Sequence, residues 1–327
     1  MTAPVAPLLA VRQLRVEYRL RPDWPWQAPP RVRAVEDLNF NLYPGETLGI
    51  VGESGSGKST LARALVGLEP ISAGAASFAG QDLVGLREPG WRALRRDIQM
   101  VFQDPLASLD PRMSIGASVA EPLEFLCPEI GADERAARVR QLLERVGIPA
   151  AEHHRYPQEF SGGQCQRVGI ARALIVQPRL LICDEPVSAL DVSVQAQVLN
   201  LLRELQRERG LAMLFIGHDL AVVRHVSQRV LVLYFGRAME QGAAAQLFSA
   251  PRHPYTRALL AAIPGVQAPP EHRLLEGELP SPLHPPPGCA FATRCPMADE
   301  QCTRRPPHSR RFADGGMASC HYAVDSA

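Results

Sequence analysis

At 327 residues the chain is long enough for one large domain with an appendage, or for two domains. Hydrophobic residues make up 46% of it, and 35 Lys and Arg nearly balance 34 Asp and Glu, which argues against disorder and against a nucleic-acid-binding surface. No stretch approaches the roughly 20 apolar residues of a membrane-spanning helix, and the N-terminus lacks a secretory signal pattern. We therefore expect a cytoplasmic protein that does not cross the membrane.

Short apolar runs alternate with helical patterns along the chain. They are TLGIVG at 47–52, IQMVFQ at 98–103, RLLICDEP at 179–186, LAMLFIGH at 211–218 and RVLVLYFG at 229–236. Strands that alternate with helices are typical of a mostly parallel sheet, so an α/β fold is predicted. Residues 8–18 and 32–43 are expected to form antiparallel strands, and residues 113–176 are expected to be mainly helical.

The composition changes toward the C-terminus. A proline-rich stretch, PPEHRLLEGELPSPLHPPPG, occupies residues 269–288 and is too rigid and polar for a core. We predict a main domain at 1–250 and a C-terminal extension at 251–327.

GESGSGKST at 52–60 follows an apolar strand and opens a helical segment, as the phosphate-loop pattern G-x-x-x-x-G-K-[ST] requires. Backbone N–H groups and the helix N-terminus attract phosphate oxygens, Lys58 reaches the terminal phosphates, and the Ser59 hydroxyl can bind Mg²⁺. Lys58 is the only lysine in the chain, which reflects either arginine-rich usage or a site that needs a compact ammonium. A glycine turn without a ligand is the alternative. The other predicted nucleotide-binding residues of the loop are Gly52, Glu53, Ser54, Gly55, Ser56, Gly57 and Thr60.

An acid pair ends the apolar run RLLICDEP. Asp184 would hold Mg²⁺, and Glu185 would orient or deprotonate the attacking water. Two solvated acids at a strand end are the alternative, which the phosphate loop makes less attractive.

FSGGQCQR at 160–167 predicts a second anion-binding helix start. Ser161 is an N-cap candidate, and the amides of Gly162 and Gly163 would face an anion. With two such starts, the chain either binds two ligands or completes the site of a neighbouring molecule. An ordinary capped helix remains the alternative.

The motifs GESGSGKST, VFQDP, FSGGQCQR, LLICDEP, SALD and GHD follow in this order between residues 52 and 219 and resemble those of ABC transporter ATP-binding subunits. The resemblance implies a phosphate-loop NTPase fold: a mostly parallel core sheet, an antiparallel β subdomain and a helical signature subdomain at about 104–176, here followed by the small extension. It also implies that two such domains sandwich two ATP molecules. Ser161, Gly162, Gly163 and Gln164 would then act in trans on the partner's ATP.

The resemblance assigns roles to four more residues. Gln103 would lie between Mg²⁺ or water and the membrane partner, and Asp191 would belong to a loop at the dimer contact. His218 would contact the terminal phosphate, and Tyr18 would stack on adenine. For Tyr18 and His218 an ordinary packing role is the alternative.

HPYTRALLAAIP at 253–264 and the cysteine-containing segment after it are similar to the C-terminal extension of peptide and nickel importers. The resemblance implies an ATPase at the cytoplasmic face of the membrane, with two membrane-spanning permease subunits and an extracytoplasmic binding protein. The dimer partner would be a second related ATPase or a second copy. Peptide is the expected cargo, and nickel or another small solute is the alternative. An exporter ATPase, a soluble ABC-type ATPase and an iron–sulfur sensing protein are less expected.

Four of the seven cysteines gather near the C-terminus, with the spacing C-x5-C-x6-C-x17-C. Disulfides are not expected in a reducing cytosol, so thiolate ligation of a metal is the leading interpretation. The resemblance favours a 4Fe–4S cluster. Zinc, with His321 as a substitute ligand, and free structural thiols remain open. The four predicted ligands are Cys289, Cys295, Cys302 and Cys320.

Overall fold

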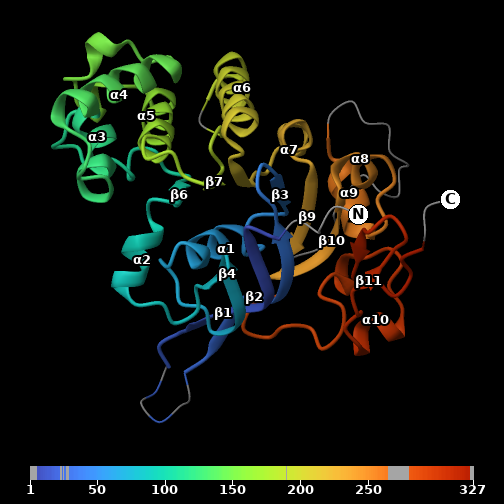
Figure 1. Ribbon diagram of the computed structural model, residues 1–327. Helices are drawn as coiled ribbons and strands as arrows, with labels where there is room; N and C mark the ends of the chain where they lie inside the picture. Colours follow the sequence, from blue (N-terminus) through green and yellow to red (C-terminus); the bar gives the residue numbers. More distant parts are fainter. Residues whose placement is uncertain are drawn as a thin grey trace. The chain divides into compact units, whose positions relative to one another are not determined.

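The computed structural model describes residues 6–22, 24, 26, 29–188, 190–263 and 280–324 (Figure 1). The chain divides into two compact units, each built from separate segments. The first unit comprises Met1–Leu8, Leu42–Thr47 and Leu86–Ile216, and the second comprises Leu9–Asn41, Leu48–Gly85 and Gly217–Ala327. The predicted boundary near residue 250 falls inside the second unit and stays a prediction. Much of the proline-rich stretch lies outside the described residues.

The first unit contains three parallel strands in the order β8-β7-β6. They are β6 (Ile98–Val101), β7 (Leu180–Asp184) and β8 (Ala212–Ile216). Every residue of β7 and β8 is buried, which explains why both strands read as unbroken apolar runs. Because the strands are parallel, the polar residues that follow β6 and β7 meet at one edge.

The helices of the first unit confirm the helical prediction for residues 113–176. In Figure 1 the green helices α3, α4 and α5 form one group, with contacts of α3 to both of the others. The helical elements of this unit are α2 (Glu88–Leu94), α3 (Ile115–Leu126), α4 (Ala132–Arg145), η1 (Ala150–Glu152), η2 (Pro157–Glu159), α5 (Gly162–Leu174) and α6 (Val192–Arg209).

The second unit contains an antiparallel sheet and a mixed set of strands. The first sheet has the order β2-β1-β4-β5 and includes both strands predicted near the N-terminus. In the second set, β3 and β9 are parallel, while β10, β12 and β11 continue the order antiparallel. The strands are β1 (Leu9–Arg19), β2 (Arg31–Leu42), β3 (Thr47–Val51), β4 (Ala73–Phe78), β5 (Gln81–Asp82), β9 (Arg229–Tyr234), β10 (Arg237–Ala243), β11 (Arg310–Arg311) and β12 (Met317–Ala318).

The C-terminal extension adds strands to the second unit. Ala318 of β12 pairs with Glu240 of β10. This pairing joins the segment that holds the four C-terminal cysteines, residues 289–320, to the sheet that holds β3 and β9. No helix in the described part of the chain has the length and apolarity to span a bilayer. The helical elements of this unit are α1 (Lys58–Leu65), α7 (Leu220–Val226), α8 (Ala244–Ser249), α9 (Pro254–Ala261), η4 (Ala292–Arg294) and α10 (Glu300–Arg304).

Candidate functional site

The loop after β3 turns sharply into helix α1, and Gly57 makes this turn possible. Its φ is 99°, and a Cβ at this position would lie 2.2 Å from the carbonyl oxygen of Ala34. Gly57 is also the N-cap of α1, which begins at Lys58 without a side-chain cap and without an acidic residue in its first turn. The helix N-terminus therefore keeps the partial positive charge that favours an anion.

Lys58 is buried at the centre of the loop. Its ammonium donates to the carbonyl oxygens of Gly52 and Glu53, each at 2.8 Å, and approaches the Ser56 hydroxyl at 3.4 Å. The Ser56 carbonyl in turn accepts the N–H of Gly236, after β9, at 2.9 Å. The predicted loop, residues 52–60, thus surrounds a single ammonium group.

Tyr18 lies beside the start of α1. It is half-buried near the end of β1, and its hydroxyl contacts Thr60 Oγ1 at 3.4 Å. The structure therefore brings Tyr18 to the phosphate loop, while the stacking of its ring on adenine stays a prediction.

The acid pair lies at the carboxyl end of β7. Asp184 is buried, and Glu185 has a φ of 49°, in the left-handed region that non-glycine residues rarely adopt. The Glu185 N–H donates to the Ile216 carbonyl at 3.0 Å, which helps to hold this conformation. Strain of this kind costs about 1–3 kcal/mol and is common at functional sites. Gln103, which is exposed, follows the neighbouring strand β6 at the same edge.

The signature segment forms a complete capping box at the start of α5. Ser161 Oγ accepts the Gln164 N–H at 3.2 Å, and Gln164 Oε1 accepts the Ser161 N–H at 2.9 Å. The box fixes the first helical turn, which also contains Gly162 and Gly163. The predicted N-cap is confirmed, and the rigid helix start is suited to bind an anion.

The predicted site residues divide between the two units. The first unit carries the signature residues, the acid pair, Gln103 and the exposed Asp191 at the N-cap position of α6. The second unit carries Tyr18, the phosphate loop and the exposed His218. Within each unit the residues occupy strand ends and helix starts, as the motif spacing indicated.

Two contacts to the phosphate loop were not predictable from the motifs. Arg294 binds the Glu53 carboxylate through both terminal nitrogens, at 2.6 and 3.0 Å. The Tyr255 hydroxyl accepts the Glu53 N–H at 2.9 Å. These partners are 241 and 202 residues from Glu53 in sequence, so no local pattern could have indicated them.

The four C-terminal cysteines are free thiols, of which Cys289 and Cys302 are buried and Cys295 and Cys320 are half-buried. Burial raises the pKa of Cys289, Cys302 and Cys295, for Cys295 to about 11, and neighbouring thiols add to each shift. Four thiols suit iron or zinc chemically, but no group of three or more His, Cys, Asp or Glu in the described residues is arranged to hold a metal. His321 uses both ring nitrogens in contacts with Gln301 and Arg305, so it is a poor zinc ligand in this arrangement.

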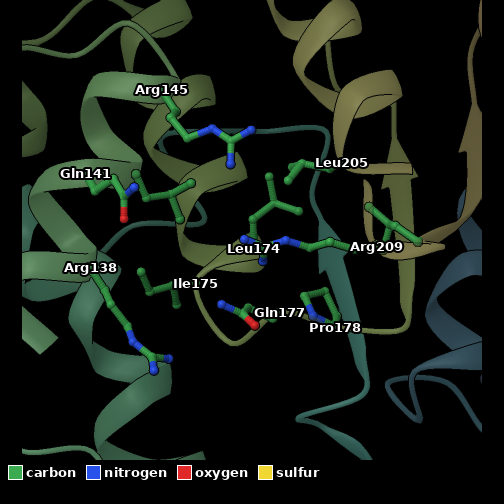
Figure 2. Close-up of a pocket in the computed structure, with 11 residues that line it drawn as sticks. Arg138, Gln141, Arg145, Leu174, Ile175, Gln177, Pro178, Leu205 and Arg209 are labelled. Carbon is green, nitrogen blue, oxygen red and sulfur yellow. The ribbon is translucent and has the colours of Figure 1, made fainter. Parts of the chain in front are cut away.

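A separate small pocket lies within the first unit. Its volume is about 80 Å³. Figure 2 shows the side chains that line it, which come from α4, from the end of α5 and the segment after it, and from α6. Arg145 at its rim pairs with Glu204 and Glu208, at 3.2 and 3.8 Å. None of its lining residues is a predicted site residue, so this pocket is not part of the predicted nucleotide site.

Two family patterns match this sequence, and together they cover most of it. The ABC transporter pattern matches residues 35–188, and the pattern of the oligopeptide/dipeptide transporter C-terminal region matches residues 239–302. The chain is 53% identical over 306 residues to the oligopeptide transport ATP-binding protein OppF of Escherichia coli strain K12, with 92% of each chain covered. It is 50% identical over 295 residues to the di/tripeptide transport ATP-binding protein DppF of Pseudomonas aeruginosa, covering 90% of this chain and 91% of that protein.

Solved structures with the same fold include two ATP-binding cassettes. One is a dimer in a post-hydrolysis state bound to ADP and Pi, with a TM-score of 0.66 and 28% identity over 72% of this chain and 98% of that one. The other is cbiO1 of Clostridium perfringens, part of an ABC transporter complex, with a TM-score of 0.62 and 30% identity over 75% of this chain and 91% of that one.

Proposed function

The chain belongs to the ABC transporter family of oligopeptide and dipeptide transport ATP-binding proteins, and from this premise we propose that it is the ATP-hydrolysing motor of a peptide importer. Its fold is that of an ABC nucleotide-binding cassette, an α/β phosphate-loop NTPase. The observation that carries the proposal is the phosphate loop, closed around Lys58 at the uncapped start of α1.

In this proposal ATP binds at residues 52–60. The loop N–H groups and the N-terminus of α1 hold the phosphates, Lys58 neutralises the terminal ones, and Tyr18 stacks on adenine. Ser59, Asp184 and Gln103 offer the oxygen ligands that Mg²⁺ prefers, and a bound Mg²⁺ would offset phosphate charge. The contact of Tyr18 with Thr60 and the burial of Asp184 at a strand end support these assignments.

Hydrolysis needs an activated water and a stabilised phosphate. Glu185 orients or deprotonates the water, and its constrained backbone supports this role because it fixes the direction of the side chain. His218 contacts the terminal phosphate and, together with Lys58, stabilises the charge that develops there.

The signature residues, Ser161 to Gln164, act on the ATP of a second cassette. Two anion-binding helix starts in one chain support this arrangement, as does the dimeric state of the related cassette bound to ADP and Pi. Asp191 lies at the contact between the two cassettes. ATP binding closes the dimer, and hydrolysis reopens it. The partner is a second related ATPase subunit or a second copy of this chain.

The motor couples to two membrane-spanning permease subunits through the segment after Gln103. The chain is then peripheral, at the cytoplasmic side of the inner membrane, and receives cargo indirectly from an extracytoplasmic binding protein. The ATP-binding domain comprises residues 1–250, with a helical subdomain at about 104–176, and the importer-type extension comprises residues 251–327.

We also propose that Cys289, Cys295, Cys302 and Cys320 hold a 4Fe–4S cluster. The four sulfur donors of this segment support the proposal, and they would have to converge to bind the cluster. Protein purified without oxygen should be brown with stoichiometric iron and sulfide, and Cys295→Ser should lose both. Cys127→Ser, which changes a buried cysteine of the first unit, is the matched control and should keep them. Zinc in a colourless anaerobic preparation would overturn the proposal.

The function is tested by uptake of a labelled tripeptide and of nickel in source cells. Glu185→Gln should still bind MgATP but hydrolyse it at least about 100-fold more slowly, because it lacks the base. Peptide uptake should then fail while nickel uptake continues. Glu144→Gln, at an exposed position on α4, is the matched control and should transport normally. If peptide uptake is unchanged and nickel uptake fails, the cargo is nickel and not peptide.

A further inference from the structure

Glu53, the second residue of the phosphate loop, is held by two side chains from the C-terminal part of the chain. Arg294 forms two parallel hydrogen bonds to its carboxylate, from Nη1 to Oε2 at 2.6 Å and from Nη2 to Oε1 at 3.0 Å. The Tyr255 hydroxyl accepts the Glu53 backbone N–H at 2.9 Å. The Arg294 side chain is 6% exposed and that of Glu53 is 23% exposed, so water screens this ion pair much less than a surface pair.

Aromatic packing fixes the two side chains that bind Glu53. The Tyr255 ring lies 4.7 Å from that of Tyr234 and 5.2 Å from that of Phe291, measured between centroids. The Tyr234 hydroxyl also accepts a hydrogen bond from Arg294 Nη1 at 3.4 Å. Both tyrosines are fully buried, so each presents its hydroxyl from a fixed ring. The contacts to Glu53 are therefore built into the core of the second unit.

The Glu53 peptide connects this aromatic cluster to Lys58. Its carbonyl accepts the Lys58 ammonium at 2.8 Å and the Ser56 N–H at 3.2 Å. On the other side, the backbone of Gly52 is so close to the Leu233 carbonyl oxygen that a Cβ would lie 2.0 Å from it. Glu53 thus bonds to the extension through its N–H and carboxylate, and to the central lysine of the loop through its carbonyl.

The ion pair between Arg294 and Glu53 also affects the charge of the phosphate loop. A carboxylate in a loop that binds phosphates places a negative charge close to a negative ligand, which weakens binding. The guanidinium of Arg294 neutralises that charge with bidentate geometry. Removal of Arg294 would therefore expose the bound phosphates to an unpaired carboxylate, while Tyr255 still binds the Glu53 N–H.

We propose that Arg294 and Tyr255 are positioning residues for the phosphate loop, so that the C-terminal extension sets the affinity of this chain for ATP. The inference rests on the proposed binding of ATP at this loop. Arg294 also directly precedes Cys295 in sequence. A rearrangement of the segment that holds the four cysteines, residues 289–320, would therefore move the residue that binds Glu53 of the loop.

The test measures MgATP binding by calorimetry and hydrolysis by phosphate release, in the full chain. Arg294→Met should raise the dissociation constant for MgATP by about tenfold to a hundredfold, because the partly buried Glu53 carboxylate loses its partner. The turnover rate at saturating ATP should change less than the KM. Adding Glu53→Gln to Arg294→Met should restore the dissociation constant to within about threefold of wild type, because the amide carries no charge. A purely structural loss would not be rescued in this way.

Two further variants sharpen the test. Tyr255→Phe keeps the ring and removes the acceptor of the Glu53 N–H, and should weaken MgATP binding by about tenfold. Arg252→Met is the matched control, since Arg252 is also a buried arginine of the extension but pairs with Asp314, at 2.9 Å. It should bind MgATP like wild type.

Equal affinity in Arg294→Met and wild type, or no rescue by Glu53→Gln, would overturn the inference while the proposed function stands. A wild-type chain that does not bind MgATP would overturn the proposed function itself.

Discussion

Gly55 and Gly57 of the phosphate loop both have a positive φ, of 76° and 99°, but their surroundings differ. A Cβ on Gly57 would meet the Ala34 carbonyl oxygen at 2.2 Å, whereas a Cβ on Gly55 would meet nothing within 4 Å. Comparing substitutions at the two positions therefore distinguishes the cost of a left-handed backbone from the cost of a steric clash. Of these two positions, Gly57 is the one where the fold leaves no room for a side chain.

We predict that Gly57→Ala lowers the free energy of unfolding by at least about 3 kcal/mol, because the loop must move away from Ala34. Gly55→Ala should cost only about 1 kcal/mol, for the left-handed backbone alone. Urea denaturation without nucleotide measures both. Equal losses in the two variants would show that the clash at Gly57 is relieved at little cost.

The phosphate loop was predictable from the sequence because the motif has a separate requirement at each position. Glycine allows the turn, lysine suits phosphate and a serine hydroxyl suits Mg²⁺. The partners of Glu53 were not predictable, because Arg294 and Tyr255 lie far along the chain and follow no periodic pattern with it. The motif identified the loop but not what holds it in place.

At the scale of elements, the start of α5 combines a structural cap with the proposed anion site. Ser161 Oγ and the Gln164 side chain complete the capping box, at 3.2 and 2.9 Å. The same first turn would face the phosphate of a partner's ATP. Substitutions at Ser161 can separate these two roles.

Ser161→Ala should lower the free energy of unfolding by about 1 kcal/mol, because the Gln164 N–H loses its acceptor. Ser161→Asp should keep the stability, since Asp is an equally good N-cap, but should reduce ATP hydrolysis more strongly because its charge repels phosphate. Denaturation without nucleotide and phosphate release give the two readouts. Full activity of Ser161→Asp would contradict the proposed contact with phosphate.

The strands were predictable to the extent that they are buried. The apolar runs predicted β3, β6, β7, β8 and β9, because strands covered on both faces are apolar over most of their length. β11 and β12 were not predicted, since each has only two residues; β12 pairs with the distant strand β10, and β11 pairs with β12. Alternation cannot be seen in so short a segment.

At the scale of the whole molecule, His253 makes the fold sensitive to acid. It is 1% exposed, caps α9 by accepting the Tyr255 N–H at 3.0 Å, and donates its own backbone N–H to Glu240 at 2.9 Å. Burial lowers the pKa of His253 to about 3, while an unfolded histidine titrates near about 6.5. Below that pH the unfolded chain takes up a proton that the folded chain does not, so stability falls as the pH falls.

This difference predicts a loss of about 2 kcal/mol between pH 7 and pH 5 from His253 alone. His253→Asn keeps an N-cap acceptor and removes the titration, so its stability should depend less on pH over this range. Glu240, whose pKa burial raises, is present in both proteins and cancels in the comparison. Urea denaturation at the two pH values measures the effect, and identical pH dependence in both proteins would rule out His253 as its source.

The solitary Lys58 has a practical consequence for anyone handling the protein. Apart from the α-amino group, an amine-directed reagent finds one target in the chain, and that target lies buried inside the phosphate loop. A protease that cuts only after lysine would leave the folded chain whole and divide the unfolded chain into residues 1–58 and 59–327. The amount of these two fragments would therefore report how often the chain opens around Lys58, without any label attached to the protein.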